Sequence, residues 1–254
     1  ILFVTPIVAM ILSFMVSLGF NYTIEGKQRR FIKSAFSQCL SKEVVNQIVN
    51  NPDSFKLGGD SFIMTAIFSD IQKFSTFSEI LSAEELGELL NIYLTKMSDI
   101  IMKEKGTIDK YEGDAIVAMV GAPYAIEDHA KRACSAAIKI KQEEKELNKQ
   151  IEFIGSLENY FELPTEYQHI NRTLYSACKK LVNNKIKIYT RIGINSGEMI
   201  AGYFGSANKK NYTMMGKNVN LASRLEGVNK QYSTGGILIS EATKILLEDD
   251  FLVR

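Results

Sequence analysis

The chain has few of the residues on which most nucleophilic and transition-metal sites depend. Its 254 residues include only two histidines and three cysteines. Cys39, Cys134 and Cys178 are odd in number and lack the spacing of a zinc site, so we interpret them as reduced thiols in a cytosolic setting. His129 and His169 lie far apart in the sequence, and a structural or solvent-facing role is favoured for each. A site built on His or Cys is therefore not indicated.

An excess of charge of either sign is also missing. The formal net charge is +1, and the Lys and Arg residues are scattered along the chain. Proteins that bind nucleic acid concentrate positive charge on one surface. We therefore expect no nucleic-acid partner. The apolar content suits a globular core, and the length suits one substantial domain with appendages.

The first residues carry no charge at all. Residues 1–24 are mostly apolar and long enough to span a bilayer as a helix. Lys27, Arg29, Arg30 and Lys33 follow, and this cluster predicts an inner-membrane protein whose remaining chain is cytoplasmic. A signal peptide and a buried helix are the alternatives, but no basic segment precedes the apolar run as it does in a signal peptide. Because the chain begins without Met, we expect it to be a piece of a longer protein.

A linker is predicted between this span and the main domain. Over residues 25–56, apolar residues at helical spacing predict two short helices joined at Ser41, which suits an N-cap. A solvated linker is the alternative. The apolar stripe favours a contact surface, with a second copy of the chain as a candidate partner. Residues 57–254 form the main domain.

Strand and helix patterns alternate through the main domain. Residues 62–68 suit a buried strand, and Ser82 with Glu85 forms a capping box that opens a helix. Residues 107–111 and 115–120 suit two strands around a tight turn. With the helix and strand that follow, the order is strand, helix, strand, strand, helix, strand. This order predicts an α+β fold of the ferredoxin-like kind, with helices on one face of an antiparallel sheet.

The second half of the domain is less regular. Residues 126–149 predict a helix, and residues 187–195 and 198–204 predict another hairpin, turning at Ser196 and Gly197. Residues 150–185 show no clean period and lead to no firm prediction. A helix over 218–232, a strand over 236–239 and a last helix capped by Ser240 complete the domain.

Two carboxylates stand at the ends of apolar runs. The segment FSDIQKF contains Asp70, and DKYEGDAI contains Asp114. Strand ends can hold two acids from distant parts of a sequence side by side. Because no His or Cys lies near either acid, they indicate an oxygen-ligand site for Mg²⁺ or Mn²⁺, ions that act on nucleoside triphosphates. The alternative is that each acid serves only a turn or a cap.

Four segments in order carry a family resemblance: FSDIQKFS, GTIDKYEGDAIVAMVGAP, RIGINSGEMIAGYFGS and YTMMGKNVNLASRLEG. Over about residues 62–240 the chain resembles the catalytic domain of the class III adenylyl and guanylyl cyclases. Its opening helix pair resembles the transducing segment that joins a membrane helix to such a domain. The resemblance implies a homodimer with two active sites at the interface.

For the metal end of the site, the resemblance implies that Asp70, Asp114 and the carbonyl of Ile71 bind two Mg²⁺ or Mn²⁺ ions. A helix is expected to open directly after Asp70, where backbone N–H groups up to Phe74 and Ser75 would hold the triphosphate.

Gly113 would let the hairpin turn tightly and bring its backbone near the metals.

For the base, the resemblance implies that Lys110 and Thr213 read the purine. Lys110 would donate to adenine N1, and the Thr213 hydroxyl would accept from the 6-amino group. Guanylyl cyclases carry Glu and Cys at these places, so the pair favours ATP. The alternative for Lys110 is a strand lysine whose side chain reaches out to solvent, and the alternative for Thr213 is a threonine present only because it favours β-structure.

Asn220 and Arg224, four apart on one helix face, complete the set. The resemblance implies that Asn220 orients the ribose and that Arg224 stabilises charge on the transferring phosphoryl group. An ion pair is the alternative for Arg224. Lys217 departs from the family, where bacterial relatives often have Asp. The chain also stops at Arg254, before the strands where the family places a further triphosphate-binding Lys.

We therefore predict a membrane-anchored adenylyl cyclase that converts ATP to cyclic AMP and pyrophosphate as a homodimer. A guanylyl or relaxed-specificity cyclase is one alternative. A catalytically silent, cyclase-like regulatory domain is the other, and the intact set of site residues argues against it.

Overall fold

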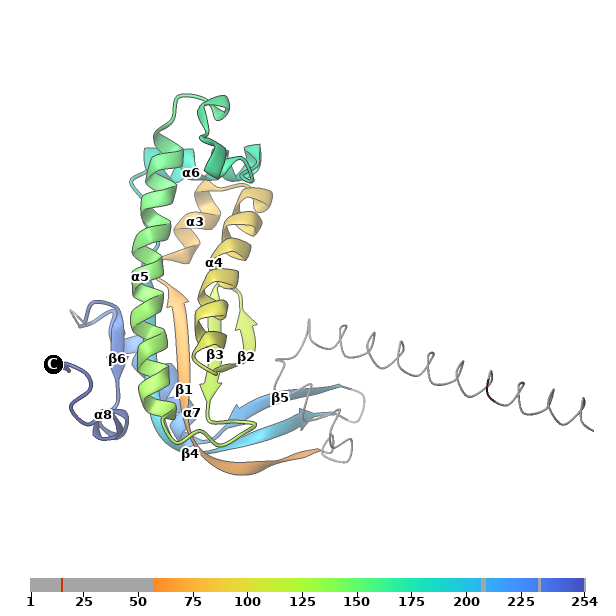
Figure 1. Cartoon of the computed structure of the whole chain (residues 1–254), viewed down its shortest axis with the longest axis vertical. Helices are drawn as coiled ribbons and strands as arrows, with labels where there is room; N and C mark the ends of the chain where they lie inside the picture. Colours follow the sequence, from red (N-terminus) through yellow and green to blue (C-terminus); the bar gives the residue numbers. More distant parts are fainter. Residues whose placement is uncertain (1–14, 16–56, 207–208, 233, 254) are drawn as a thin grey trace, which may run out of the picture. The chain divides into compact units, whose positions relative to one another are not determined.

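A computed structural model describes Met15 and residues 57–206, 209–232 and 234–253 of the chain. The residues from 57 onward lie in one compact unit, Lys56–Arg254, built on a six-stranded sheet. Figure 1 shows the long helices α4 and α5 lying along this sheet. The elements in chain order are β1 (Gly58–Ile71), α3 (Phe74–Ile80), α4 (Ala83–Lys103), β2 (Thr107–Glu112), β3 (Ala115–Val120), α5 (His129–Ser156), η2 (Tyr160–Glu162), η3 (Thr165–Tyr167), α6 (Arg172–Asn183), β4 (Thr190–Gly205), β5 (Lys210–Met215), α7 (Lys217–Asn229), β6 (Ile237–Ile239) and α8 (Glu241–Leu247).

The sheet is antiparallel except at its last strand. Its order is β2-β3-β1-β4-β5, and the short β6 pairs in parallel with β4. The strands β2-β3-β1-β4 with the crossover helices α4 and α5 give the strand and helix order predicted from the sequence. The α+β prediction is therefore confirmed. β1 pairs with β4 along its whole length of 14 residues, twice the length of the predicted strand.

The two faces of the sheet pack against different helices. Ile67 of β1 with Ile192 and Ile194 of β4 are fully buried in the core that α4 and α5 complete. Because side chains alternate along a strand, Gly193 faces the other way. A Cβ built on Gly193 would lie 2.2 Å from the backbone nitrogen of Glu226 in α7. Glycine thus lets α7 pack directly on the second face of the sheet.

The segment without a clear sequence prediction forms a small helical layer. α5 continues to Ser156, well past the predicted end, and η2, η3 and α6 follow at the far end of α5 and α4 (Figure 1). Glu85 fixes α6 in place, since its carboxylate accepts hydrogen bonds from Ser176 at 2.6 Å and Lys180 at 2.7 Å. The same carboxylate accepts from the Ser82 amide in the predicted capping box of α4. The acid that starts α4 therefore also anchors the inserted layer.

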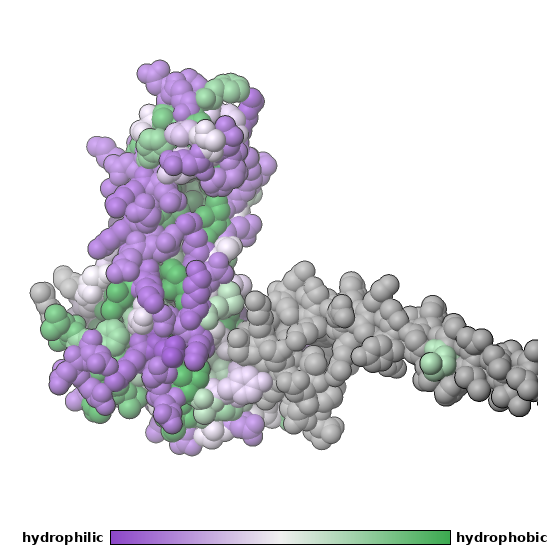
Figure 2. Space-filling model, viewed as in Figure 1, coloured by the Kyte–Doolittle hydropathy of each residue, from purple (hydrophilic) through white to green (hydrophobic). Residues whose placement is uncertain are grey.

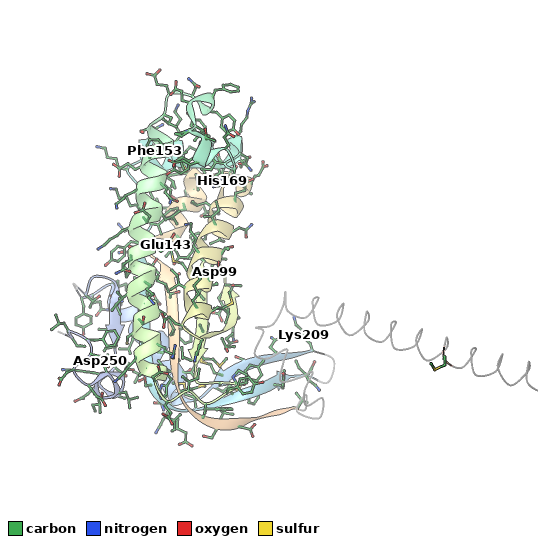
Figure 3. All side chains as sticks on the ribbon, viewed as in Figure 1. Asp99, Glu143, Phe153, His169, Lys209 and Asp250 are labelled. Carbon is green, nitrogen blue, oxygen red and sulfur yellow. The ribbon has the colours of Figure 1, made fainter. Side chains whose placement is uncertain are left out.

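Hydrophilic side chains cover the outward face of α5 (Figure 2), as its charged sequence from Lys139 onward predicts. Figure 3 shows Glu143 on this helix, where it forms an ion pair of 2.5 Å with Lys96 of α4.

The predicted hairpin at Ser196 and Gly197 is wrong. β4 runs without a break from Thr190 to Gly205 and turns only afterwards into β5. Gly197 instead adopts a φ of 155° within the strand, a conformation that favours glycine, and a Cβ there would lie 2.6 Å from the side-chain nitrogen of Asn218. The backbone conformation inside β4, and not a turn, explains the glycine.

The predicted membrane localisation is also corrected. Within the part of the chain that the structure describes, no helix has both the length and the apolar character that a membrane span requires. Residues 1–24, on which the prediction rested, lie outside the described residues apart from Met15, as do the linker helices predicted over 25–56. We withdraw the inner-membrane placement, and no anchor enters the function proposed below.

Glu85→Gln should destabilise the fold at neutral pH but much less in acid. Burial alone would raise the pKa of Glu85, but the bonds from Lys180, Ser176 and Ser82 outweigh it and lower the pKa from 4.5 to about 2. The folded pKa lies below the unfolded one, so the carboxylate stabilises the fold above pH 4.5, and this contribution is lost as the pH falls towards 2. In urea titrations we expect a loss of about 1–3 kcal/mol at pH 7.

Glu84→Gln, an exposed change in the same helical turn, serves as the control and should have little effect at either pH. If Glu85→Gln cost the same free energy at pH 7 and at pH 3, the charge of Glu85 would not be the source of its contribution.

Candidate active site

Two carboxylates meet where β1 ends and the β2–β3 hairpin turns. Asp114 lies in the two-residue turn, where Gly113 adopts a φ of 67° that favours glycine. The Asp114 carboxylate accepts a hydrogen bond of 2.9 Å from the amide of Ile71. Burial, together with the adjacent carboxylate of Asp70, raises the pKa of Asp114 to about 7. The structure thus brings together two acids that are far apart in the sequence.

A largely buried arginine balances part of this negative charge. Arg191 stands opposite Asp70 in the β1–β4 pairing and forms an ion pair with its carboxylate. Its guanidinium also lies 3.0 Å from the carboxylate of Glu226 in α7. Sequence reasoning missed Arg191 and Glu226. The available signal was a lone cation at the start of the apolar strand RIGIN.

The donor set of this acid site fits a hard divalent cation. Asp70 and Asp114 supply carboxylate oxygens, which Mg²⁺ and Mn²⁺ prefer. The two negative charges repel each other, and a bound cation would neutralise them. Residues 57–253, as far as they are described, contain no group of three or more His, Cys, Asp and Glu side chains suited to a metal. An ion held here would therefore take its remaining ligands from backbone, solvent or substrate oxygens.

A second polar group lies between β2 and β5. The Thr213 hydroxyl donates a hydrogen bond of 2.6 Å to Asp109, and the Lys110 ammonium lies 3.6 Å from the other carboxylate oxygen of Asp109. β2 and β5 stand at opposite ends of the strand order, so this contact shows that the sheet curls until its two edge strands meet. The structure therefore places Lys110 and Thr213 together, through an acid that sequence reasoning missed.

Asn220 and Arg224 lie on the exposed side of α7. Neither side chain forms a hydrogen bond or ion pair with another described residue, so the ion pair considered for Arg224 does not occur within this part of the chain. The nearby Glu226 pairs with Arg191 instead. Both residues remain available to a ligand or to a second copy of the chain.

The helix after Asp70 begins later than predicted. β1 continues to Ile71, a turn follows, and α3 starts at Phe74 after Lys73 with a φ of 59°. No side chain caps this first turn. The ring of Phe74 stacks on Phe77 with centroids 6.1 Å apart, while Ser75 is exposed. Of the backbone amides predicted to lie at the start of this helix, only those of Phe74 and Ser75 belong to its first turn.

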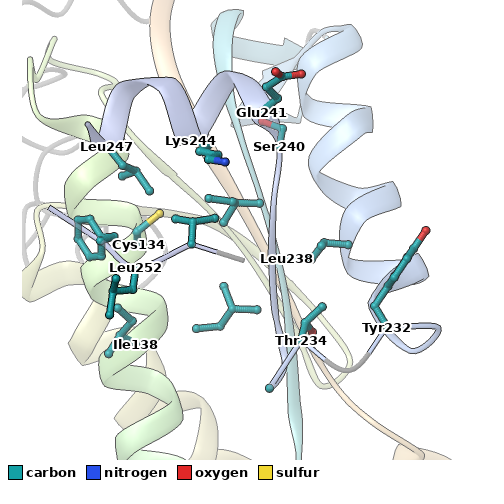
Figure 4. A pocket seen from close by; sticks show the side chains of 15 residues that line it. Cys134, Ile138, Tyr232, Thr234, Leu238, Ser240, Glu241, Lys244, Leu247 and Leu252 are labelled. Atoms are coloured by element: carbon teal, nitrogen blue, oxygen red, sulfur yellow. The ribbon is translucent and has the colours of Figure 1, made fainter. Parts of the chain in front are cut away.

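A cavity of about 910 Å³ lies elsewhere, between α5, β6, α8 and the last described residues (Figure 4). Its lining is mainly apolar and includes Leu238, Leu247 and Leu252. None of the predicted site residues lines it, so it has no part in the candidate active site.

The cysteines and histidines also lie outside the site. Cys134 and Cys178 are free and buried, and burial raises the pKa of each thiol to about 12, so both are inert. Cys39 lies outside the described residues. His129 opens α5 with its Nδ1 2.7 Å from the Thr65 hydroxyl. His169 lies beside α6 at the other end of α5 (Figure 3).

Comparisons with known sequences point to one family. The family described as "Adenylate and Guanylate cyclase catalytic domain" matches residues 62–254. Adenylate cyclase 1 of Rhizobium meliloti is 33% identical over 232 residues, which are 89% of this chain and 30% of that protein. The adenylate cyclase of Anabaena cylindrica is 28% identical over 213 residues, 84% of this chain and 35% of that protein. The chain thus spans about a third of the length of these relatives.

Solved structures give the same result. The adenylyl cyclase CyaB from P. aeruginosa is 34% identical with a TM-score of 0.58, covering 76% of this chain and 84% of that one. The guanylyl cyclase Cya2 is 32% identical with the same TM-score, covering 76% of this chain and 82% of that one. The two likenesses are nearly equal, so only local residues can separate adenine from guanine chemistry.

Asp114→Asn should stabilise the protein in the absence of metal. The amide oxygen can still accept from Ile71, but one of two adjacent negative charges is removed. Because the folded pKa of Asp114 lies above its ordinary value of 3.8, ionisation costs the folded state free energy at pH 8. In EDTA at pH 8 we expect calorimetry to show a melting temperature higher by about 2–4 °C, equivalent to roughly 1 kcal/mol.

Mn²⁺ should raise the melting temperature of the wild type and have much less effect on Asp114→Asn. Asp128→Asn is the matched control, because Arg132 lowers the pKa of Asp128 and its neutralisation should slightly destabilise. A lower melting temperature for Asp114→Asn in EDTA would show that the two acids do not repel each other.

Proposed function

The chain belongs to the family of adenylate and guanylate cyclase catalytic domains, and we propose that it is an adenylate cyclase that converts ATP to 3′,5′-cyclic AMP and pyrophosphate. The observation that carries the proposal is the meeting of Asp70 and Asp114 at one end of the sheet. The adenylate cyclases of Rhizobium meliloti and Anabaena cylindrica support the reaction class. The polar pair Lys110 and Thr213 supports ATP as the substrate.

Asp70 and Asp114, with the carbonyl of Ile71, would hold two Mg²⁺ or Mn²⁺ ions in each active site. When bound, these ions would lower the pKa of the ribose 3′ hydroxyl and neutralise phosphate charge. The ion pair with Arg191 would hold the carboxylate of Asp70 in place for these ions. Gly113 keeps the hairpin turn tight enough to place Asp114 beside Ile71.

The remaining residues bind and orient ATP. The amides of Phe74 and Ser75 at the uncapped start of α3 would contact the triphosphate. Lys110 would donate to adenine N1, while Thr213 would accept from the 6-amino group. Asn220 would orient the ribose.

In the reaction, the ribose 3′ oxygen loses its proton to solvent and attacks the α-phosphorus. The bond from that phosphorus to the bridging oxygen breaks, and pyrophosphate leaves with the electron pair. Negative charge builds on the transferring phosphoryl group, and the guanidinium of Arg224 would stabilise it.

A homodimer is part of the proposal. Asn220 and Arg224 are exposed and have no partners among the described residues, and no described hydrogen bond or ion pair joins either of them to Asp70 or Asp114. We infer that α7 of one protomer completes the acid site of the other across a two-fold interface.

The second candidate function is a guanylate or relaxed-specificity cyclase. It is favoured by the likeness to Cya2, which nearly equals the likeness to CyaB. A catalytically silent regulatory domain is disfavoured, because each site residue that we assign within this chain is of the required chemical type.

Product analysis should separate these candidates. Incubated with Mn²⁺ and either nucleotide, the chain should form cyclic AMP and pyrophosphate from ATP, with little cyclic GMP from GTP. The variant Lys110→Glu, Thr213→Cys should weaken ATP use and raise GTP use, because the two side chains that read the purine then offer a different hydrogen-bond polarity. Asp70→Ala should form neither product. Cyclic GMP as the main wild-type product would exclude the adenylate assignment.

Co-expression of Asp114→Ala with Arg224→Ala tests the shared site. Each variant alone should form a homodimer with two dead sites. A mixed dimer carries both lesions in one site and leaves the other intact, and random pairing makes half of the dimers mixed. Activity should therefore recover to roughly a quarter of the wild-type value. No recovery in demonstrated mixed dimers would contradict the shared site.

A further inference from the structure

Asp109 stands between the two residues to which we assign purine recognition. Its side chain is only 2% exposed, and one of its oxygens accepts from both the Thr213 hydroxyl at 2.6 Å and the Met214 amide at 3.3 Å. Its other oxygen is buried, has no hydrogen-bond partner among the described residues, and lies 3.6 Å from the Lys110 ammonium. Lys110 itself is about half exposed, so its ammonium can reach a ligand.

A β-bulge puts Asp109 in this position. The register between β2 and β3 shifts between Ile108 and Lys110, so Asp109 is the extra residue without a partner in β3. A bulge re-aims a side chain that regular alternation would send to the other face. The bulge therefore turns both Asp109 and Lys110 toward β5, where Thr213 lies.

The contacts of Asp109 favour its ionised form. Burial raises the pKa of Asp109, while the Thr213 hydroxyl and the Lys110 ammonium oppose this. One oxygen already faces two donors, and a proton on the other would point at an ammonium. An ionised carboxylate has no hydrogen to give, so it can only accept.

This acceptor removes the freedom of the Thr213 hydroxyl. A hydroxyl has one hydrogen and two lone pairs, and it ordinarily rotates to suit its ligand. Here the hydrogen is committed to Asp109, so only lone pairs remain for a ligand. Lone pairs can accept from the 6-amino group of adenine but cannot donate to the 6-oxo group of guanine.

We propose that Asp109 is a positioning residue that selects adenine. It accepts the hydrogen of the Thr213 hydroxyl, so toward the purine this hydroxyl can act only as a hydrogen-bond acceptor. The inference rests on the proposed cyclase function and deepens it. Asp109 touches neither nucleotide nor metal in this role and acts only through Thr213.

Asp109→Asn tests the inference, since an amide has the same shape but carries no charge and has only one acceptor oxygen, so it binds the hydrogen of the Thr213 hydroxyl less firmly than a carboxylate does. We expect the ratio of kcat/KM for ATP to kcat/KM for GTP, measured with the full chain and Mn²⁺, to fall roughly tenfold. Damage to the fold would lower both rates and leave the ratio unchanged. Asp99→Asn, the same chemical change at an exposed position of α4, is the control and should keep the wild-type ratio (Figure 3).

A double-mutant cycle separates an effect through Thr213 from one through Lys110. Thr213→Val removes the hydroxyl, so adding Asp109→Asn to it should change the ratio less than about twofold. If Asp109→Asn lowers the ratio equally with and without the hydroxyl, Asp109 acts through Lys110 and the inference is overturned. An unchanged ratio in Asp109→Asn alone overturns it as well.

Binding measurements distinguish failure of this inference from failure of the proposed function. Titration calorimetry with 3′-deoxy-ATP and 3′-deoxy-GTP, which lack the attacking hydroxyl, reports base preference without turnover. The wild type should prefer the adenine analogue, and Asp109→Asn should lose much of that preference. If Asp109→Asn keeps the wild-type preference for the adenine analogue, the role of Asp109 is overturned but the proposed function is not. A wild type that neither turns over nor binds either nucleotide overturns the proposed function, and the role of Asp109 with it.

Discussion

The pairing of β1 with β4 is the constraint on which both polar groups depend. Because the two strands stay in register from Gly58 to Ile71, Asp70 faces Arg191 at one end of the ladder. At the other end β4 leads into β5, and the curl of the sheet returns Thr213 to β2. A slip of one residue would move every side chain to the opposite face. Asp70 would then enter the apolar core under α4 and α5.

Carboxylates have opposite effects on stability in the helical layer around α6 and at the acid site. The carboxylate of Glu85 is surrounded by donors, so its ionisation stabilises the helical layer. At the acid site, Asp114 has one backbone donor and a like charge beside it, so its ionisation opposes folding. Functional sites commonly carry such unfavourable interactions, which the rest of the fold must offset. The contrast supports a ligand-binding role for the acids and a structural one for Glu85.

Local signals were readable from the sequence, and long-range contacts were not. The capping box of Ser82 and the β2–β3 hairpin depend on neighbouring residues, and both agree with the structure. Gly197 resembled a turn residue because its actual neighbour, Asn218, comes from another element. Asp109 and Arg191 were missed for the same reason, since each is explained only by a partner about a hundred positions away. Residues 1–24 and 25–56 lie outside this comparison.

The β2–β3 hairpin connects the two polar groups, and this has a mechanical consequence. Its bulge is fixed to β5 through Asp109, and its turn is fixed to β1 through the bond from Ile71 to Asp114. Between these attachments the hairpin cannot shift without disturbing both. On the proposed function, the bulge end of the hairpin carries Lys110, which would read the base, and the turn end carries Asp114, which would bind the metal ions beside the phosphates. In a two-fold dimer these two ends of the hairpin would serve different active sites, so a ligand that moves the hairpin at one site would alter the other.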